Sequence, residues 1–182
     1  MITSRKTLTE AIKNHQSPYE DEVTFCERFL YILQQSGCYK RENLPGHITG
    51  SSWIIDTERK HVLLTHHAKL NKWLQPGGHA DGDENILGVA LREAEEETGL
   101  KALELLNPLP FDLDIHIIPA RDNFPEHFHY DVRFIFGASI NDILHVSHES
   151  NDLKWISLSE IELYTDNASI LRMKQKTLQH FR

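Results

Sequence analysis

The sequence has few cysteines and no long apolar segment. Cys26 and Cys38 are the only two cysteines among 182 residues, and their spacing is not that of a metal site or a disulfide framework. We therefore expect reduced thiols and a cytoplasmic protein. No stretch of about 18 apolar residues is available to span a membrane, and the first residues lack the apolar run of a signal peptide. A membrane partner is not expected.

Basic residues are outnumbered by acidic ones. The chain has 19 Lys and Arg against 27 Asp and Glu, which gives a net charge of -8 at pH 7. A surface that binds nucleic acid needs an excess of basic residues, so a nucleic-acid polymer is not an expected partner. An acidic protein that handles anionic phosphates needs a metal ion or local cations to attract them. The length suits one domain with a sizeable core and a short N-terminal addition.

The most specific pattern lies between Gly78 and Leu100. It fits G-x5-E-x7-R-E-U-x-E-E-x-G-U at every fixed position, where U is a bulky aliphatic residue or alanine. Seven specified residues at fixed spacing arise by chance on the order of once in 10^8 starting points. The residues at these fixed positions are Gly78, Glu84, Arg92, Glu93, Glu96, Glu97 and Gly99.

The spacing within this pattern predicts a helix that carries clustered carboxylates. Apolar residues recur every three or four positions from Ile86 to Thr98, and a glycine follows where a left-handed C-terminal cap belongs. Glu93, Glu96 and Glu97 then share one face, about one turn apart. Clustered carboxylates raise one another's pKa unless a cation lies among them. Their oxygen atoms suit Mg2+ or Mn2+, either of which can polarise a phosphoryl group.

An alternative is that this acidic run is only a solvated helix face. The paired glycines before the helix, together with Glu84 and Arg92, favour the metal site instead. On these residues the chain resembles the Nudix superfamily, whose members mostly hydrolyse a diphosphate bond in derivatives of nucleoside diphosphates with a divalent metal ion. The resemblance covers roughly Ile48 to Leu163. It implies an α/β fold, the α/β/α sandwich with a mixed sheet.

The resemblance also implies roles for individual residues. Glu96 and Glu97 match the main metal ligands, the backbone carbonyl of Gly77 matches a further ligand, and Glu93 matches a ligand or a general base. Arg92 matches the arginine that holds glutamate carboxylates in position, with Glu84 expected among them.

One further acidic residue is implied by the resemblance alone. An acidic residue in the loop after the histidine-bearing strand often reaches the metals or the attacking water in this superfamily. Glu149 occupies that loop here, and we expect it to act with the glutamates of the motif.

Periodicity outside the motif predicts the remaining elements. Residues 1–45 are expected to form a helical extension packed on a Nudix domain of residues 46–182. Two helices are expected in the extension, the second begun by the capping-box pattern Ser17-Pro18-Tyr19-Glu20. Alternating or apolar runs predict strands over 48–56, 61–65, 111–118, 127–140 and 153–157, and a final helix over 166–182.

Two of the expected strands carry an unusual polar face. In the first, Asp112, Asp114 and His116 alternate with apolar residues, and the second alternates in the same way. If the strands pair, their polar faces form one patch, which we expect to be a wall of the substrate pocket, and Arg133 is expected to bind phosphate. The expected wall residues are His116, His127, His129, Asp131 and Arg133.

Two alternatives remain for this patch. A solvent-facing sheet surface would look similar, although such surfaces favour Lys, Glu and Thr. His127, His129 and Asp131 could also form a second metal site, but ligands on alternate residues of one strand converge poorly. Upstream of the motif, Trp73 could stack on a nucleobase, whereas a Trp just before such a turn is more often part of the core.

The sequence does not name the substrate. Neither the proline that tends to mark ADP-ribose hydrolases nor the tyrosine that tends to mark dinucleoside polyphosphate hydrolases follows Gly99 at the expected spacing. An isomerase of the isopentenyl diphosphate type would need a cysteine in the pocket, but both cysteines precede the sheet. A non-catalytic nucleotide-binding module is disfavoured because the motif is intact. Dimers are common in the superfamily, so a homodimer is one assembly that the resemblance allows.

Overall fold

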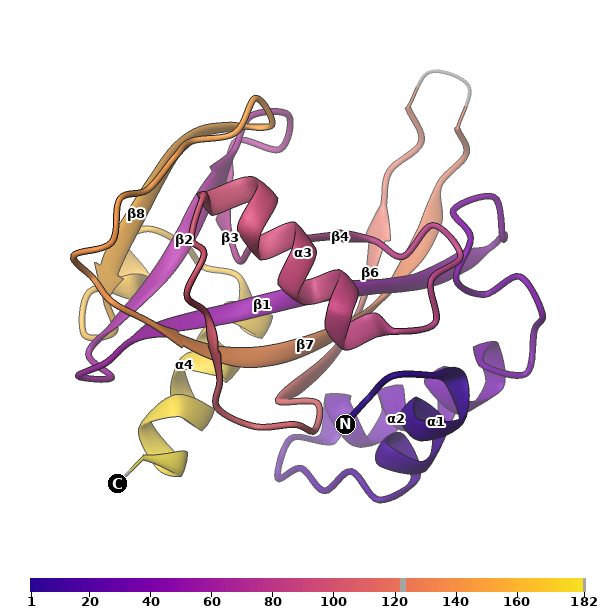
Figure 1. The fold of residues 1–182 in the computed structure, drawn as a ribbon. Helices are drawn as coiled ribbons and strands as arrows, with labels where there is room; N and C mark the ends of the chain where they lie inside the picture. Colours follow the sequence, from indigo (N-terminus) through magenta and orange to yellow (C-terminus); the bar gives the residue numbers. More distant parts are fainter. Residues whose placement is uncertain (122–123, 182) are drawn as a thin grey trace.

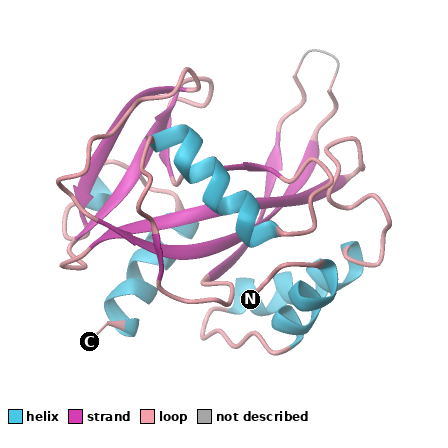
Figure 2. Ribbon diagram, viewed as in Figure 1, coloured by secondary structure: helices cyan, strands magenta, loops and turns pink. Residues whose placement is uncertain are grey.

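The computed structural model describes residues 1–121 and 124–181. These residues form a curled, mixed sheet with helices on both of its faces (Figure 1). The strand order is β3-β2-β1-β7-β5, with β4 paired to β1, β6 to β7 and β8 to β2. The expected α/β class is confirmed, and the strands stand out as a single curved layer in Figure 2.

The sheet is built around two long strands that run in parallel. β1 pairs with β7 over the full length of β1, so that residues far apart in the sequence face one another. All other strand pairs are antiparallel. The strands are β1 (Gly46–Asp56), β2 (His61–His67), β3 (Lys72–Leu74), β4 (Gly77–His79), β5 (Glu104–Leu105), β6 (Asp112–Ile118), β7 (His127–Ala138) and β8 (Ser150–Ser157).

Four α-helices and one 3-10 turn complete the described residues. They are α1 (Arg5–Lys13), α2 (Glu20–Ile32), α3 (Ile86–Thr98), η1 (Ile161–Leu163) and α4 (Ala168–His180). In Figure 1, α3 crosses in front of β1 and β7, α4 lies behind them, and α1 and α2 pack together below. None of these helices has both the length and the apolar character needed to cross a membrane.

Most expected elements are present with shifted ends, and α3 has the bounds that were expected. Three short strands were not expected, because runs of two or three residues show no periodicity. The expected capping box is wrong: Tyr19 is the N-cap of α2 and makes no side-chain cap hydrogen bond. The hydroxyl of Ser17 instead donates to Glu22. Val23 of α2 is exposed, although its side chain is apolar.

Two apolar clusters fill the two faces of the sheet. The larger contains the inner side of α3, together with apolar residues of α1 and α2 such as Leu8 and Phe29. The smaller lies under α4 and includes Trp53, whose indole N–H donates to Thr177 at 2.8 Å. The first two helices share the main core with the sheet. The division into an extension of residues 1–45 packed on a domain of residues 46–182 stays a prediction.

The close approach of α3 to the sheet places the functional motif. Asn85 caps the helix by accepting a hydrogen bond from the Gly88 N–H, and Gly99 ends it with a φ of 77°, in the left-handed region. On β1, a side chain at Gly50 would lie 2.9 Å from the carbonyl oxygen of Ile86. Ser52, the next residue of β1 on the same face of the sheet, donates a hydrogen bond to the carbonyl of Ala90 at 2.7 Å. Small residues on β1 therefore let the helix rest directly on the sheet.

Candidate metal and substrate site

Strand β4 brings two glycines against the acidic face of α3. One carboxylate oxygen of Glu97 accepts a hydrogen bond from the backbone N–H of Gly77 at 2.9 Å. A Cβ added at Gly78 would lie 2.4 Å from a carboxylate oxygen of Glu93, and a Cβ at Gly77 would lie 2.1 Å from the hydroxyl of Ser51. Gly78 therefore leaves room for the carboxylate of Glu93, while the N–H of Gly77 holds that of Glu97, and we call this acidic group the cradle.

The electrostatics of this cradle call for a cation. Burial, with the negative charges of Glu93, Glu149 and Glu96, raises the pKa of Glu97 to about 7 against the lowering effect of the Gly77 N–H. Burial, followed by repulsion from other acidic groups, also raises the pKa of Glu93 although Arg92 opposes it. A hard divalent cation would relieve this repulsion, and its preference for oxygen ligands matches the carboxylates and carbonyl present. The residues therefore fit the expected Mg2+ or Mn2+.

Glu96 differs from its two neighbours. Its side chain is exposed, whereas those of Glu93 and Glu97 are half-buried. Over residues 1–121 and 124–181, the carboxylates of these three glutamates do not all lie within 4.8 Å of one another, which fits the mutual repulsion of like charges. Their placement on one helix face is as expected, with Glu93 and Glu97 one turn apart.

Arg92 positions Glu93 but not Glu84. Its guanidinium donates to a carboxylate oxygen of Glu93 at 2.8 Å and to the backbone carbonyl of His79 at 3.1 Å. Glu84 instead pairs with Arg5 of the N-terminal extension at 3.0 Å. The expectation that Arg92 holds Glu84 is therefore wrong, because α1 supplies a nearer cation to the loop that enters α3.

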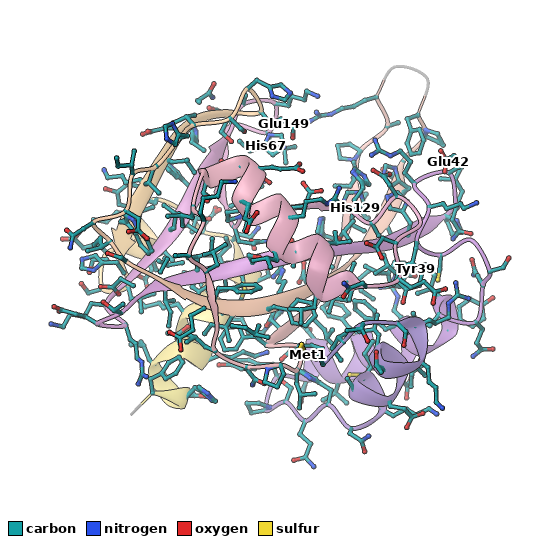
Figure 3. All side chains as sticks on the ribbon, in the orientation of Figure 1. Met1, Tyr39, Glu42, His67, His129 and Glu149 are labelled. Carbon is teal, nitrogen blue, oxygen red and sulfur yellow. The ribbon has the colours of Figure 1, made fainter. Side chains whose placement is uncertain are left out.

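Glu149 faces the same cradle from the loop before β8. Its charge raises the pKa of both Glu93 and Glu97, and the carboxylate is well exposed. Figure 3 shows Glu149 next to His67 above α3. Burial lowers the pKa of His67, and the negative charge of Glu149 opposes that shift. The backbone carbonyl of Glu149 accepts a hydrogen bond from the Ala68 N–H at 2.9 Å, which anchors the loop to the end of β2.

The polar faces of β6 and β7 do pair, as expected, but the patch they form has two different halves. In the inner half, Arg133 is 2% exposed and lies within hydrogen-bond distance of three carboxylates. It donates to Asp131 at 2.7 Å, Asp114 at 3.0 Å and Asp112 at 3.1 Å. Arg172 of α4 adds hydrogen bonds to Asp112 and Asp114. This half is a buried ion-pair network under α4.

The expected roles of Arg133 and Asp131 change accordingly. A guanidinium held by three buried carboxylates is not presented to a phosphate, so the structure gives Arg133 a supporting position within the sheet. Asp131 also accepts hydrogen bonds from Thr49 at 3.0 Å, Ser51 at 2.7 Å and Gln75 at 3.2 Å. With its lone pairs occupied in this way, Asp131 does not join His127 and His129 in a metal site.

The outer half of the patch is a cluster of imidazoles. His127 and His129 of β7 are joined by His47 of β1, whose ring centroid lies 5.0 Å and 4.9 Å from theirs. His79 of β4 and His116 of β6 flank them, with centroids 5.0 Å and 5.5 Å from that of His129. Burial lowers the pKa of His47 to about 4 and that of His129 to about 2, so both rings are neutral at pH 7.

His47 was missed by the sequence analysis. Its position opposite His129 follows from the parallel pairing of β1 with β7, and no local pattern reveals which strands pair in parallel. The only local signal for His47 was its position directly before the expected strand over 48–56.

Trp73 lies in β3, away from the imidazole cluster. Its ring stacks on His66 at a centroid distance of 5.0 Å and meets Tyr164 edge-on at 5.8 Å. The side chain packs against the smaller apolar cluster. These contacts fit the alternative that Trp73 is part of the core, and none of them points to stacking on a base.

Comparison with known proteins agrees with this geometry. Residues 47–175 match the family model described as NUDIX domain. An asymmetrical bis(5'-nucleosyl)-tetraphosphatase from Rattus norvegicus is 28% identical over 107 residues, which are 59% of this chain and 70% of that protein. Phosphatase NudJ from Escherichia coli (strain K12) is 33% identical over 92 residues, or 49% of this chain and 54% of that protein.

Other similarities are shorter or concern the fold alone. The m7GpppN-mRNA hydrolase NUDT17 of Xenopus laevis is 39% identical over 61 residues, 31% of this chain but only 21% of that protein. A NUDIX-family hydrolase from Clostridium perfringens superposes with a TM-score of 0.60 at 24% identity, over 75% of this chain and 98% of that one. An Ap4A hydrolase from C. elegans gives a TM-score of 0.59 at 20% identity, over 73% and 96%.

The family model covers more than half of the chain, and the solved structures share its fold. The motif that identifies the family is intact, and the structure assembles Gly77, Glu93 and Glu97 into one acidic cradle. This protein is a member of the Nudix hydrolase family.

Proposed function

We propose that this protein hydrolyses a diphosphate bond in a derivative of a nucleoside diphosphate, with a divalent cation held by the Nudix motif. The observation that carries the proposal is the Glu97 carboxylate, fixed on the Gly77 N–H beside Glu93 with its pKa raised to about 7. Elevated pKa values within a cluster of acidic groups are typical of functional sites. Glu93, Glu96, Glu97 and the carbonyl of Gly77 are the proposed ligands of Mg2+ or Mn2+.

The bound cation would supply charge neutralisation to the diphosphate oxygens. The chain's own residues would position the reactants around it. Arg92 holds the Glu93 carboxylate through the 2.8 Å hydrogen bond, and Glu149 approaches from the opposite loop. In the proposed reaction the oxygen of a water molecule attacks one phosphorus atom and the bridging P–O bond breaks. A nucleoside monophosphate is one product, and Glu93 or Glu149 takes the water proton.

The substrate wall is assigned to the outer half of the polar patch. His116, His127 and His129 line it, with Asp131 and Arg133 as buried support underneath, and Trp73 is kept only as a more distant candidate. The class of substrate is proposed at the level of nucleoside diphosphate derivatives. The names of the relatives add one group to test, the dinucleoside tetraphosphates.

The isomerase alternative gains no support from the placement of the thiols. Cys38 is fully buried and belongs to the main core, and Cys26 packs against that core from α2. Neither cysteine lies in the cradle or in the imidazole cluster.

The test is a hydrolysis screen with Mg2+ and with Mn2+. It covers nucleoside triphosphates, ADP-ribose, sugar nucleotides and dinucleoside polyphosphates. Glu97→Gln should abolish activity on the preferred group. Glu95→Gln, which changes a neighbouring glutamate at a variable motif position, should leave it intact. Equal activity in the wild type and Glu97→Gln, or no hydrolysis of any compound, would overturn the proposal.

A further inference from the structure

Three histidines from two strands converge beside the Nudix motif. His47 lies on β1 and pairs with His129 of β7 in the parallel register, and His127 lies two residues before His129. Each offers one ring nitrogen, and these three atoms lie within 4.8 Å of one another. His47 is 1% exposed and His127 is 6% exposed, so two of the three rings are buried.

Three ring nitrogens of this group lack hydrogen-bond partners among the described residues. In the described part of the chain, neither nitrogen of His47 has a hydrogen-bond partner, and the same holds for Nε2 of His129. Leaving a buried polar atom without a partner destabilises the folded state. Three such atoms in one cluster are unusual, because buried polar groups in proteins are nearly always satisfied. A neutral imidazole has one lone-pair nitrogen and one N–H, so a ligand that accepts one lone pair from His47 and one from His129 would reduce this cost.

The third ring already has the orientation that metal-binding histidines adopt. Nδ1 of His127 lies 2.8 Å from the backbone carbonyl of Pro125. A carbonyl oxygen can only accept, so Nδ1 carries the hydrogen and Nε2 keeps its lone pair in the neutral ring. A hydrogen bond of this kind fixes the tautomer and orientation of histidines that bind metals.

The spacing is close to what a metal ion requires. Because the three atoms lie within 4.8 Å of one another, some point between them lies no more than about 2.8 Å from each, whereas a Zn–N bond is about 2.0–2.1 Å long. The rings must each move inward by at most about 0.7 Å, which side-chain rotation can provide. The ring of His79 lies 5.2 Å from that of His47 and 5.0 Å from that of His129, so His79 is a candidate fourth ligand.

We propose that His47, His127 and His129 bind a Zn2+-class transition-metal ion, at a site separate from the carboxylates of the Nudix motif. Neutral imidazoles suit Zn2+, Ni2+, Co2+ and Cu2+, whereas Mg2+ and Ca2+ prefer oxygen ligands. The ion would join β1 to β7 at the edge of the substrate wall, where Figure 3 places His129 to the right of α3. The site does not depend on the hydrolase activity proposed above.

The test is a binding measurement on the chelator-treated, full-length protein. We expect one Zn2+ per chain by calorimetry, and with Co2+ as the probe we expect visible absorption bands of a low-coordinate, nitrogen-ligated ion. Zn2+ should raise the melting temperature, as any ligand of the native state does. His47→Gln and His129→Gln should each weaken Zn2+ binding by more than about 100-fold, because even the loss of a second-shell partner costs 10–100-fold.

Two control variants keep the test independent of folding and of the other site. His148→Gln changes an exposed histidine whose side chain is 92% accessible and should bind Zn2+ like the wild type. Glu97→Gln alters the Nudix motif and should also keep the Zn2+ site, so a failure of the hydrolase proposal leaves this result unaffected. Far-UV circular dichroism of each metal-free variant establishes that it is folded. Unchanged Zn2+ binding in His47→Gln, or no binding by the wild type, would overturn the proposal.

Discussion

The guanidinium of Arg5 lies 3.0 Å from the carboxylate of Glu84 and ties α1 to the loop that enters α3. A second arginine outside the motif does the same for this loop: Arg41 donates to both carboxylate oxygens of Asp81, at 2.7 Å and 2.6 Å. The carbonyl of Tyr39 also accepts a hydrogen bond from the Gly82 N–H at 2.8 Å. Residues N-terminal to the Nudix motif therefore hold the loop that enters α3.

The first prediction concerns this loop. In the double variant Arg5→Ala and Arg41→Ala, the amides of Gly82 and Asp83 should exchange hydrogen about five- to tenfold faster. Both pairs are partly exposed, so their loss is worth only about 1 kcal/mol or less each. Lys13→Ala removes an exposed pair with Glu10 and serves as the control. Unchanged exchange at Gly82 would show that the arginines do not hold the loop.

The second prediction concerns protons released on metal binding. Because the pKa of Glu97 is about 7 without metal, about half of these side chains are protonated at pH 7, and a cation must displace that proton. Mg2+ binding should release about 0.5 proton at pH 7 and almost none at pH 9. Its affinity should fall as pH drops below 7. Calorimetry in buffers of different ionisation enthalpy measures the release.

Variants identify the source of that proton. Glu97→Gln should bring the release close to zero, whereas Glu95→Gln should release as much as the wild type. Proton release that persists in Glu97→Gln would assign it to another group.

The third prediction concerns Glu22, which is completely buried and joins α2 to β6 and α4. It accepts hydrogen bonds from the Leu113 N–H at 2.9 Å and from His15 at 3.1 Å, and it pairs with Lys176. Burial alone would raise its pKa, but the hydrogen bond to His15 and the charge of Lys176 bring it down to about 2.

A depressed pKa stabilises the folded state above the unfolded pKa of Glu22, 4.5, and this contribution is lost as pH falls toward 2. Glu22→Gln should therefore lower the free energy of unfolding by about 3 kcal/mol at pH 7. The difference from the wild type should shrink between pH 4.5 and pH 2. Urea denaturation across this range measures it, with Glu20→Gln at the exposed start of α2 as the control. A constant difference across the range would contradict the assignment.

The fourth prediction concerns Gly78. A Cβ there would lie 2.4 Å from a Glu93 carboxylate oxygen, so Gly78→Ala must push that side chain out of the cradle. If the chain is the hydrolase proposed here, kcat/KM should fall by about 10-fold to 100-fold while the melting temperature changes little. Gly37→Ala, whose Cβ would come no closer than 3.3 Å to Asn43, is the matched control. Full activity in Gly78→Ala would separate Glu93 from the reaction.

Local features of this fold could be predicted from the sequence, and contacts between distant segments could not. The bounds of α3 follow from its apolar spacing and from Gly99, which are both local. Glu93 and Glu97 share a face for the same reason. The partner of Glu84 lies 79 residues away at Arg5, and the partner of His129 lies on a parallel strand. No periodicity within either segment carries that information.

The polar face of β7 shows the same limit at finer scale. The alternation of HFHYDVRFIF placed His127, His129, Asp131 and Arg133 on one face, which the pairing with β6 confirms. It could not show that α4 would cover half of that face and bring Arg172 to the aspartates. A patch expected to line a pocket is therefore an ion-pair network at one end and an imidazole cluster at the other.

The last prediction separates these two halves. Arg133 is buried among three carboxylates. Its removal leaves Asp131 without a cation and takes one cation from Asp112 and Asp114, which keep Arg172. Arg133→Met keeps most of the side-chain volume, yet it should lower the free energy of unfolding by about 3–5 kcal/mol. Arg121→Met, which changes an exposed arginine near the start of β7, should have almost no effect on stability.

Urea denaturation of both variants gives the stability, and KM for the substrate found in the hydrolysis screen gives the binding. If Arg133 bound phosphate, as the sequence suggested, the variant would raise KM and leave stability nearly unchanged. From the structure we expect the opposite result. Stability should fall strongly, and KM should change only to the extent that the loss of Arg133 disturbs the sheet next to the proposed substrate wall. A stable Arg133→Met protein with a raised KM would return Arg133 to the substrate site.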